Sequence, residues 1–493
     1  MTTEVKVTDT HGIDPVEITP RHVPYGPDGV DRVEGVPLST LLREYGSPLW
    51  VFSSSQLRGN FRELRDAADD LLGATEIAYS MKANNNRAVL QTLVGEGAFV
   101  DCSSEYELQI AVQAGTPANR IIVNGNGKAE SYLTVAAALG VRQINVDSLV
   151  EVRRLECIAR ELGVTVDCVV RVKLGYQRLL AVDPSYERTL RVAEAKFGSS
   201  TVTGEAIDVA NAIADSDVLR FCGLSHHAGF AGYRANYRPE LQTMHLRECA
   251  REMSEFAGTL RGLGIDTERL DVGGGLRSGK YVMLSTPGDG GDAAYHPLPS
   301  TRDYVAAVRQ GIDGGWGDAP RPVVQFETGG FQVANSCVLL TTIQDVKDTE
   351  HFTHGRFLTV DTAATMFTSR GSSRVGYPVF VAGKGPDHPV DGRPVEVVGP
   401  TCAYDSIAED IALPDVEVGD VLVVLNQGAY SEMTSTQFNG IPRPAVAMVE
   451  GEAHRLVRRR ETLSDITQRE VSPATLWPTT PSDEQRAGTH ARR

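Results

Sequence analysis

Lys82 is the residue whose position in this chain most strongly suggests chemistry. It follows the short apolar run Ile77-Ala78-Tyr79-Ser80-Met81, which has the length and composition of a buried β-strand. An ε-amine at a strand end can form a Schiff base with an aldehyde if its surroundings lower its pKa. Most lysines at strand ends are simply solvated, so this interpretation depends on what lies around Lys82.

Other reactive side chains also follow short apolar runs. They are Asp101, Arg171, His227 and Glu327, and the glycines Gly273, Gly274 and Gly275 follow a further run in the same way. Reactive groups at the carboxyl ends of successive strands are how a (β/α)8 barrel builds an active site. His226 and His227 are poor joint metal ligands because neighbours on a strand point to opposite faces, so no metal site is expected.

The glycine triplet and Glu327 supply partners for a Schiff base at Lys82. Backbone N–H groups of a glycine turn can hold a phosphate, and this turn follows the predicted seventh strand, where such barrels bind phosphate. Glu327 could pair with a pyridine nitrogen and so maintain an electron sink. Taken singly, a glycine run can be an ordinary turn and Glu327 can cap a loop. Together with Lys82 they predict pyridoxal 5′-phosphate as the cofactor.

Eight apolar runs separated by helical patterns would position these residues. The predicted strands cover residues 76–81, 98–101, 120–124, 143–146, 166–172, 220–225, 269–272 and 322–326. Amphipathic segments such as 104–114, 129–139, 148–162 and 239–263 lie between them. This alternation predicts a (β/α)8 barrel over residues 49–328, although the pattern also fits an open doubly wound sheet. The first strand is not followed by G-x-G-x-x-G, which argues against a dinucleotide-binding fold.

Beyond about residue 330 the pattern changes to short β-rich runs separated by turn residues. This change predicts a second, all-β domain over residues 329–462, against which residues 1–48 are expected to pack. The expected fold class is therefore α/β, with a barrel and a C-terminal all-β domain. Residues 285–299, rich in Gly, Pro and Asp, predict a surface loop, and the polar tail 463–493 is expected to be disordered.

Composition excludes several classes of protein. The chain has 493 residues, 41% of them hydrophobic and 23% charged, as in ordinary globular proteins. A net charge of -16 argues against nucleic-acid binding, and no apolar run reaches the roughly 20 residues of a membrane helix. The N-terminus predicts no secretory signal, and the seven unpatterned cysteines suit reduced thiols, so a cytoplasmic location is expected.

Eight segments between roughly residues 45 and 450 resemble one family in their type and order. They are Y-S-M-K-A-N (79–84), V-D-C-S-S-E-Y-E (100–107), A-K-F-G (195–198), H-A-G (227–229), D-V-G-G-G-L (271–276), G-P-T-C (399–402), G-A-Y (428–430) and F-N-G-I-P-R-P (438–444). The chain resembles the fold-type III pyridoxal-phosphate-dependent decarboxylases, which include diaminopimelate, ornithine and arginine decarboxylases. The resemblance implies amino-acid decarboxylation through an internal aldimine at Lys82 and a quinonoid intermediate. It also implies a homodimer whose active site is shared across the interface.

The resemblance implies roles for individual residues. Lys82, Asp101, Arg171, His227, Gly273, Gly274, Gly275, Glu327 and Tyr430 would bind the cofactor, with His227 stacked on the ring and Glu327 at its nitrogen. Cys402, supplied by the partner subunit, would be a candidate proton donor, and His227 would also take part in catalysis. Arg370, Tyr404 and Asp405 would contact the substrate.

The chain departs from the family pattern at the phosphate and at the substrate. Phe230 replaces a phosphate-binding Ser, Gly330 replaces an Arg, and Arg277 is the candidate replacement cation. Ala403 stands where the family commonly has an acidic residue that binds a distal ammonium of the substrate. Asp405 could take over this role. The substrate is therefore left open between a diamino acid and a siderophore or antibiotic precursor. A racemase of the same fold and a non-catalytic regulatory homologue are the alternative functions.

Overall fold

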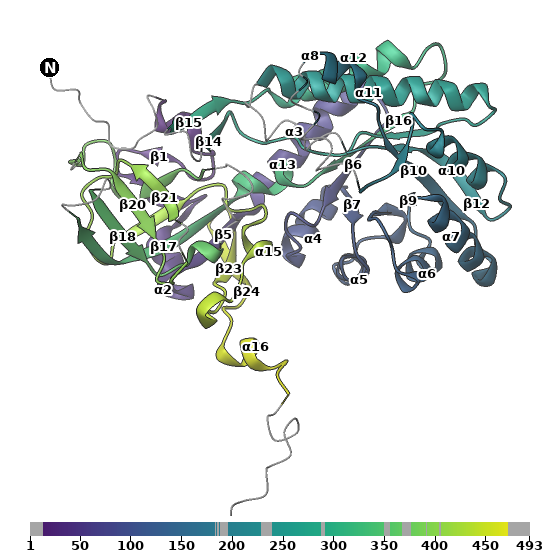
Figure 1. Cartoon of the computed structure of the whole chain (residues 1–493). Coiled ribbons are helices and arrows are strands. Elements are labelled where there is room, and N and C mark those ends of the chain that lie inside the picture. Colours follow the sequence, from purple (N-terminus) through teal and green to yellow (C-terminus); the bar gives the residue numbers. More distant parts are fainter. Residues whose placement is uncertain are drawn as a thin grey trace, which may run out of the picture.

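The computed structural model describes residues 13–182, 184, 187, 196–227, 239–286, 291–349, 355–366, 376–390, 392–403 and 406–471. Figure 1 shows a barrel of strands and helices on one side and a β-rich part on the other. Among the described residues, no helix combines the length and apolar character that a membrane crossing requires.

Eight parallel strands close into a barrel. They are β6 (Thr75–Ser80), β7 (Phe99–Cys102), β8 (Ile121–Val123), β9 (Gln143–Val146), β10 (Val166–Lys173), β12 (Leu219–Ser225), β13 (Arg269–Asp271) and β16 (Val323–Thr328). Each strand pairs with the next in this order, and β16 pairs with β6 to close the ring. The closed ring confirms the barrel and excludes the doubly wound sheet. The predicted strand ends are correct to within two residues.

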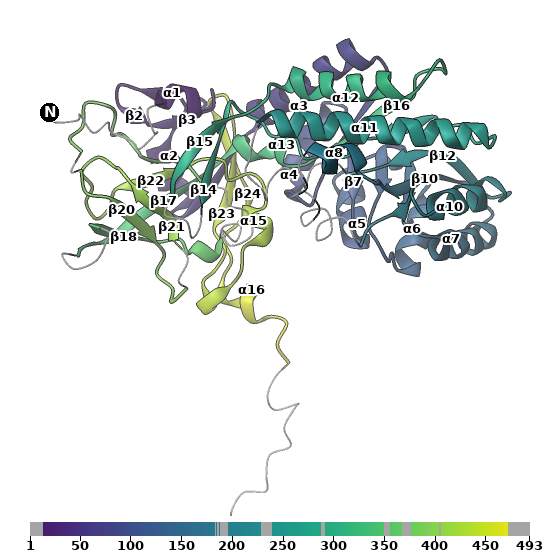
Figure 2. The same cartoon turned by 45° about the horizontal axis from the view of Figure 1, so that its top comes forward.

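Helices cover the outside of the barrel. They are α3 (Ser54–Leu72), α4 (Arg87–Gly95), α5 (Glu105–Gln113), α6 (Glu130–Leu139), α7 (Leu149–Leu162), α10 (Glu205–Ala214), α11 (Pro239–Gly262) and α12 (Thr301–Gly315). Ser104 and Ser148 cap the starts of α5 and α7, as the sequence pattern indicates. Figure 2 shows α11 and α12 running side by side. The short helix α8 (Gln177–Val182) and strand β11 (Ser199–Ser200) follow β10.

The β-rich part is built on one mixed sheet. Its strands are β5 (Leu49–Ser53), β17 (Cys337–Asp348), β18 (Arg356–Val360), β19 (Val379–Val381), β20 (Val395–Val398), β21 (Ser406–Ile411), β22 (Val421–Val424), β23 (Ala445–Glu450) and β24 (Ala453–Arg458). The predicted boundary at residue 49 assigns β5 to the barrel, but β5 pairs with β17 and β23. All five residues of β5 are buried, which suits a central strand.

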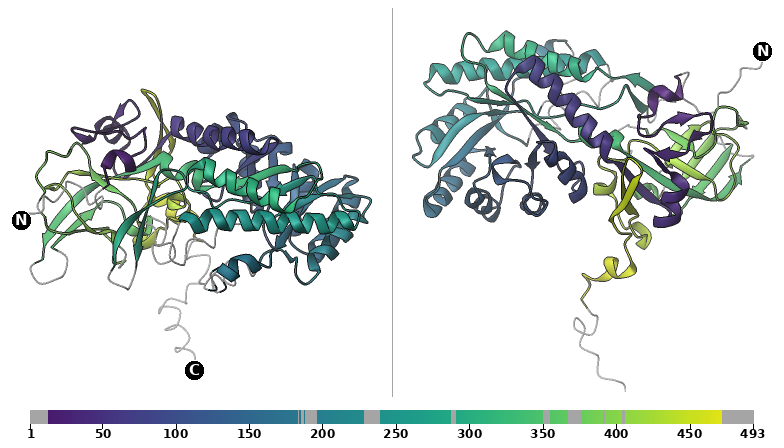
Figure 3. Two further views of the ribbon diagram at one scale, coloured as in Figure 1. Left: turned by 90° about the horizontal axis from the view of Figure 1, so that it is seen from above. Right: turned by 180° about the vertical axis from the view of Figure 1, so that it is seen from behind.

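Short N-terminal elements pack on this sheet. They are α1 (Pro15–Ile18), β1 (Tyr25–Gly26), β2 (Gly29–Val30), β3 (Arg32–Val33), β4 (Val36–Pro37) and α2 (Leu38–Tyr45). Val30, Val33 and Leu41 share one buried cluster with Val338 and Phe380. Both views of Figure 3 place this segment, in purple, against the β-rich part.

Three short helices and a hairpin complete the described structure. The helices are α13 (Gly330–Val333), α15 (Ser431–Thr434) and α16 (Leu463–Thr467). The prediction of a loop over 285–299 is wrong, because β14 (Tyr281–Thr286) and β15 (Gly291–Pro297) form an antiparallel hairpin. In the predicted tail, α16 carries a capping box of Thr462 and Asp465, while residues 472–493 lie outside the described residues.

Candidate active site

Polar residues from seven barrel strands meet at the carboxyl end of the barrel. They are Ser80, Asp101, Asn124, Asn145, Ser225, Asp271 and Glu327, and all are buried. Hydrogen bonds join them into one network. Each residue lies near the end of its strand or directly after it, so closure of the barrel brings distant segments of the chain together.

Lys82 lies two residues beyond the end of β6, next to this network. Asp101 accepts hydrogen bonds from Ser80 Oγ at 2.6 Å and from Asn124 Nδ2 at 2.8 Å, which fix its carboxylate. Lys82 retains an accessible surface, although protein atoms surround it closely. This enclosure lowers the pKa of Lys82, but Asp101, Tyr430 and Glu327 raise it more, so the net pKa is above the ordinary value. The sequence-based expectation of a lowered pKa is thus reversed by the neighbouring acids.

Glu327 and Asp271 form a buried acid pair. Asn124 Nδ2 lies 2.5 Å from Glu327 Oε1, and Ser225 Oγ donates to Asp271 Oδ2 at 2.9 Å. Burial raises the pKa of both carboxyls, and the negative charges of Asp271 and Asp101 raise that of Glu327 further. Of the two carboxyls, Glu327 therefore has the more strongly raised pKa.

The glycine triplet allows three loops to approach one another. A Cβ at Gly274 would lie 2.2 Å from the carbonyl oxygen of Glu327, and one at Gly273 would lie 2.6 Å from His227 Cα. Gly273 and Gly275 have φ of 69° and 92°, which favour glycine. The triplet is therefore required for close packing of the β12, β13 and β16 ends.

The two histidines after β12 face different surroundings, as strand geometry predicts. His226 Nδ1 lies 3.1 Å from the carbonyl oxygen of Val172, and its Nε2 lies 3.2 Å from Tyr176 Oη. His227 instead faces Gly274 and the Lys82 side of the site. Burial, together with the charges of Lys82 and Arg171, holds the pKa of His227 well below its usual range, so its imidazole is neutral. No group of potential metal ligands occurs among the described residues.

Arg171, on β10, lies beside the Phe197-Gly198 element. Its guanidinium is 4.6 Å from the centre of the Phe197 ring, a cation–π contact. A Cβ at Gly198 would lie 2.8 Å from the carbonyl oxygen of Arg171, and Gly198 has φ of 71°. Gly198 N donates to Asp147 Oδ1 at 2.7 Å. The K-F-G segment therefore packs against the arginine through a glycine that cannot be replaced freely.

Tyr430 brings the β-rich part to the barrel site. It lies beside Lys82, whose pKa it affects, and directly precedes α15. Asn84 Nδ2, in the loop that carries Lys82, lies 3.3 Å from the carbonyl oxygen of Gly428 and 3.1 Å from Glu432 Oε2. The site is therefore formed by both parts of the molecule.

Comparison with known proteins assigns this site to a family. A family model described as "Pyridoxal-dependent decarboxylase, pyridoxal binding domain" matches residues 58–334, more than half of the chain. The chain belongs to the pyridoxal-dependent decarboxylases. It is an enzyme that removes CO2 from an amino acid with pyridoxal 5′-phosphate as cofactor. The racemase and the non-catalytic alternatives are not favoured.

Relatives of this decarboxylase match along nearly the whole chain. Diaminopimelate decarboxylase of Mycobacterium tuberculosis is 30% identical over 92% of this chain and 98% of its own. That of Pseudomonas aeruginosa is 31% identical over 88% of this chain and 95% of its own. The structure of diaminopimelate decarboxylase from M. jannaschii has a TM-score of 0.78 at 24% identity, covering 90% of this chain and 96% of that one, which shows a shared fold.

The residues of the decarboxylase fit its cofactor. Lys82 supplies an amine, Glu327 supplies a buried carboxyl with a raised pKa, and the glycine triplet supplies a tight loop at a barrel mouth. Neutral His227 lies against this loop. An amine, an acid and a glycine loop are the three groups that a pyridoxal phosphate needs for its aldehyde, its ring nitrogen and its phosphate.

Cys402, another residue expected in the decarboxylase site, lies in the β-rich part. Cys402 is exposed, and its Sγ lies 3.7 Å from the side-chain amide of Asn439, so the G-P-T-C and F-N-G segments meet. The predicted substrate contacts Arg370, Tyr404 and Asp405, and the departure Phe230, lie outside the described residues.

The sequence interpretation missed Ser80, Asn124, Asn145, Ser225 and Asp271. Each connects or supports the acids of the site. Their signal was present, because each is a polar residue within or directly after a short apolar run, the pattern that identified Lys82. The amides and hydroxyls among them carry no charge, and Asp271 was considered only as part of the glycine segment 271–276.

Proposed function

We propose that this decarboxylase acts on a diamino acid of the diaminopimelate class. The supporting observation is that relatives named diaminopimelate decarboxylase match 88–92% of this chain. The barrel and the β-rich part both fall within these matches, so the resemblance extends to the whole architecture and not only to the cofactor site.

We further propose roles for the residues of the site. Lys82 binds the cofactor aldehyde, the Glu327 carboxyl faces the ring nitrogen, and the glycine triplet binds the phosphate. Neutral His227 can stack on the ring without adding a positive charge. When bound, the cofactor draws electrons from the substrate Cα. Hydrogen bonds from Ser80 and Asn124 hold the Asp101 carboxylate beside the lysine.

A shared site in a cytoplasmic homodimer completes the proposal. Cys402 is exposed on the β-rich part, where the side chain is accessible to a second subunit. Free cysteines throughout the chain suit a reducing compartment. In this arrangement Cys402 of one subunit would donate a proton to the substrate carbon in the other.

Release of CO2 from a panel of amino acids tests the proposal. We expect release from meso-diaminopimelate above that from monoamino acids. Lys82→Ala should abolish both CO2 release and the borohydride-reducible bond to the cofactor, while Lys347→Ala, at an exposed lysine of β17, should change neither. A panel in which only monoamino acids react would overturn the substrate class. A reduced adduct at another lysine would overturn the role of Lys82.

A further inference from the structure

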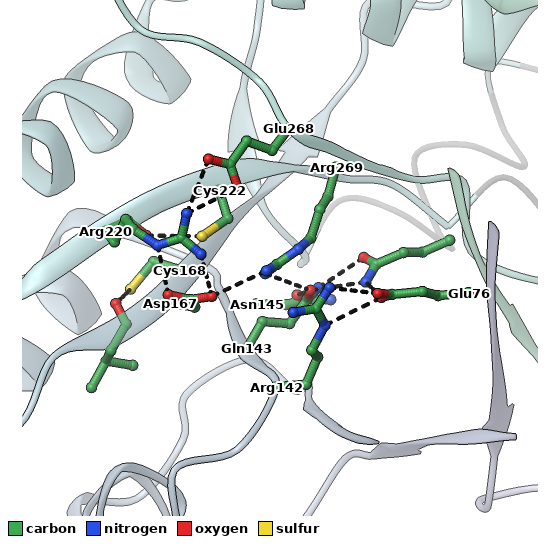
Figure 4. Close-up of polar contacts among 12 residues, drawn as sticks. Glu76, Arg142, Gln143, Asn145, Asp167, Cys168, Arg220, Cys222, Glu268 and Arg269 are labelled. Atoms are coloured by element: carbon green, nitrogen blue, oxygen red, sulfur yellow. Dashed lines mark hydrogen bonds and ion pairs between the residues drawn. The ribbon is translucent and has the colours of Figure 1, made fainter. Parts of the chain in front are cut away.

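The interior of the barrel below the site is polar over two layers. Three strands place polar residues two apart, on the same face: Gln143 and Asn145 on β9, Arg269 and Asp271 on β13, and Gln325 and Glu327 on β16. Branched apolar side chains usually fill such barrels. Figure 4 shows the lower layer as a continuous series of polar contacts between Glu268 and Glu76.

A buried cation lies at the lower end of this series. Arg269 is 5% exposed, and its Nη2 lies 3.1 Å from Asp167 Oδ2. Arg220 also binds Asp167 and reaches Glu268 at the surface. Burial raises the pKa of Asp167, but hydrogen bonds from Arg220 and Arg269 outweigh it and hold the pKa below its ordinary value. The carboxylate therefore stays ionised and keeps Arg269 in place.

Arg269 sets the orientation of the next side chain. Its Nη1 lies 3.4 Å from Gln143 Oε1, and because a guanidinium only donates, the amide oxygen must face it. Gln325 Nε2 donates to the same oxygen at 2.9 Å. The amide nitrogen of Gln143 then faces the oxygen of Asn145, at 2.9 Å.

Asn145 connects Gln143 to the acid pair of Glu327 and Asp271. Because its oxygen accepts from Gln143, its nitrogen faces the site. Asn145 Nδ2 lies 3.2 Å from Asp271 Oδ2 and 3.3 Å from Glu327 Oε1. The charged groups that act on the pair are Asp101 on β7 and Lys82 after β6, and Arg171 on β10 and His227 after β12 lie around Lys82.

We propose that Asn145, oriented from the far end of the barrel by Arg269 through Gln143, is a positioning residue for the Glu327 and Asp271 pair. A hydrogen bond donated to a carboxyl group favours its ionised form. Asn145 would thereby favour the ionised form of Glu327, the form that would pair with a protonated ring nitrogen of the cofactor. The inference rests on the proposed placement of Glu327 at that nitrogen.

The variant Gln143→Met tests this directly. It preserves an unbranched side chain but removes the amide that donates to the Asn145 oxygen, so Asn145 is held less firmly and donates less well to Glu327. A ring with less positive charge raises the pH midpoint of the visible absorbance of the lysine-bound cofactor, by about 0.5–1 unit. We expect weaker cofactor binding together with this shift.

Gln325→Met is the matched control. Gln325 lies in the same layer and contacts Gln143 and Glu76, but it does not bridge Arg269 to Asn145. Its loss should lower thermal stability about as much as Gln143→Met does, with the absorbance midpoint unchanged, because Arg269 still orients Gln143. A midpoint shift of equal size in both variants, or in neither, overturns the inference.

A second comparison separates this inference from the proposed function. Glu327→Gln should shift the midpoint further in the same direction if Glu327 faces the ring nitrogen. If Glu327→Gln shifts it but Gln143→Met does not, the role of Asn145 fails and the placement of Glu327 stands. If Glu327→Gln leaves the midpoint unchanged, the placement itself fails.

Discussion

The backbone amide of Tyr430 donates a hydrogen bond of 2.8 Å to the carbonyl oxygen of Ala83. Ala83 directly follows Lys82 on the barrel side, whereas Tyr430 belongs to the β-rich part. Tyr430 has φ of 60°, a left-handed conformation uncommon for a non-glycine residue, which its neighbours must hold in place. The loop that presents the reactive lysine is thus fixed from outside the barrel, and its geometry depends on how the two parts pack.

Glu432 should contribute strongly to this junction. It is buried, accepts a hydrogen bond from Asn84 Nδ2 at 3.1 Å and pairs with Arg458. Glu432→Ala leaves a buried amide with an unmet hydrogen bond, so the free energy of unfolding should fall by about 1–3 kcal/mol. Urea denaturation measures this loss. Glu452→Ala, at the exposed turn between β23 and β24, should change it by no more than about 0.5 kcal/mol, and equal losses would contradict the role of Glu432.

His22 should make stability depend on pH. It is buried in the N-terminal segment, and burial lowers its pKa from 6.5 to about 4, although Gln56 at 3.3 Å partly opposes this. Between these values the unfolded chain binds a proton that the folded chain does not. The free energy of unfolding should therefore fall with decreasing pH from 6.5 to 4, by about 1.4 kcal/mol per pH unit from this residue.

Urea denaturation at several pH values between 7 and 4.5 measures that slope. His22→Gln should make the slope of the unfolding free energy against pH shallower by the contribution of one proton. His388→Gln, at an exposed histidine, should leave this slope as in the wild type. If the slope for His22→Gln equals that of the wild type, the His22 imidazole does not remain neutral in the folded chain.

The barrel and its reactive strand ends were predictable from sequence because their signal is local. Each strand is a short apolar run, and the carboxyl ends of parallel strands converge. The sequence alone therefore predicts that Lys82, Asp101 and Glu327 lie together. The polar interior could also have been found, since Gln143 and Asn145 alternate with apolar residues along one strand.

Features that depend on distant pairing were not predictable. In the sequence, β5 is an apolar strand that could be the first strand of the barrel. Only its pairing with residues 337–340 and 445–449 shows that it belongs to the β-rich part. The pairing of β14 with β15 is local, but this segment was predicted as a loop because its glycines and prolines dominate the local pattern. The direction of the Lys82 pKa shift likewise depends on acids brought from other strands.

Mixing two inactive variants should reveal a site shared between subunits. If Cys402 acts on the partner's Lys82 site, neither Lys82→Ala nor Cys402→Ala is fully active alone, but a mixed dimer contains one intact site. Random exchange should then restore about a quarter of wild-type CO2 release, since about half the dimers are mixed. Lys82→Ala mixed with Glu327→Ala is the control, because both changes lie in the barrel and no site is restored. Activity unchanged by mixing would place Cys402 outside the shared site.

Gly330→Arg should strengthen cofactor binding. Gly330 begins α13, three residues after Glu327, and takes the position where the resembling decarboxylases carry a phosphate-binding Arg. A Cβ at Gly330 would meet no atom of the described residues within 4 Å, so a larger side chain fits there. One added hydrogen bond from a charged group contributes ~1.5 kcal/mol, so the Kd for pyridoxal phosphate should fall by about tenfold.

Titration of cofactor-stripped protein by absorbance measures this change. Gly330→Ala is the control, because it adds the Cβ and helix propensity without the charge, and its Kd should match the wild type. Arg277→Met should weaken binding if Arg277, which follows the glycine triplet, replaces the missing cation, and adding Gly330→Arg to it should recover the loss. A Kd that Gly330→Arg leaves unchanged would show that the phosphate does not lie beside the start of α13.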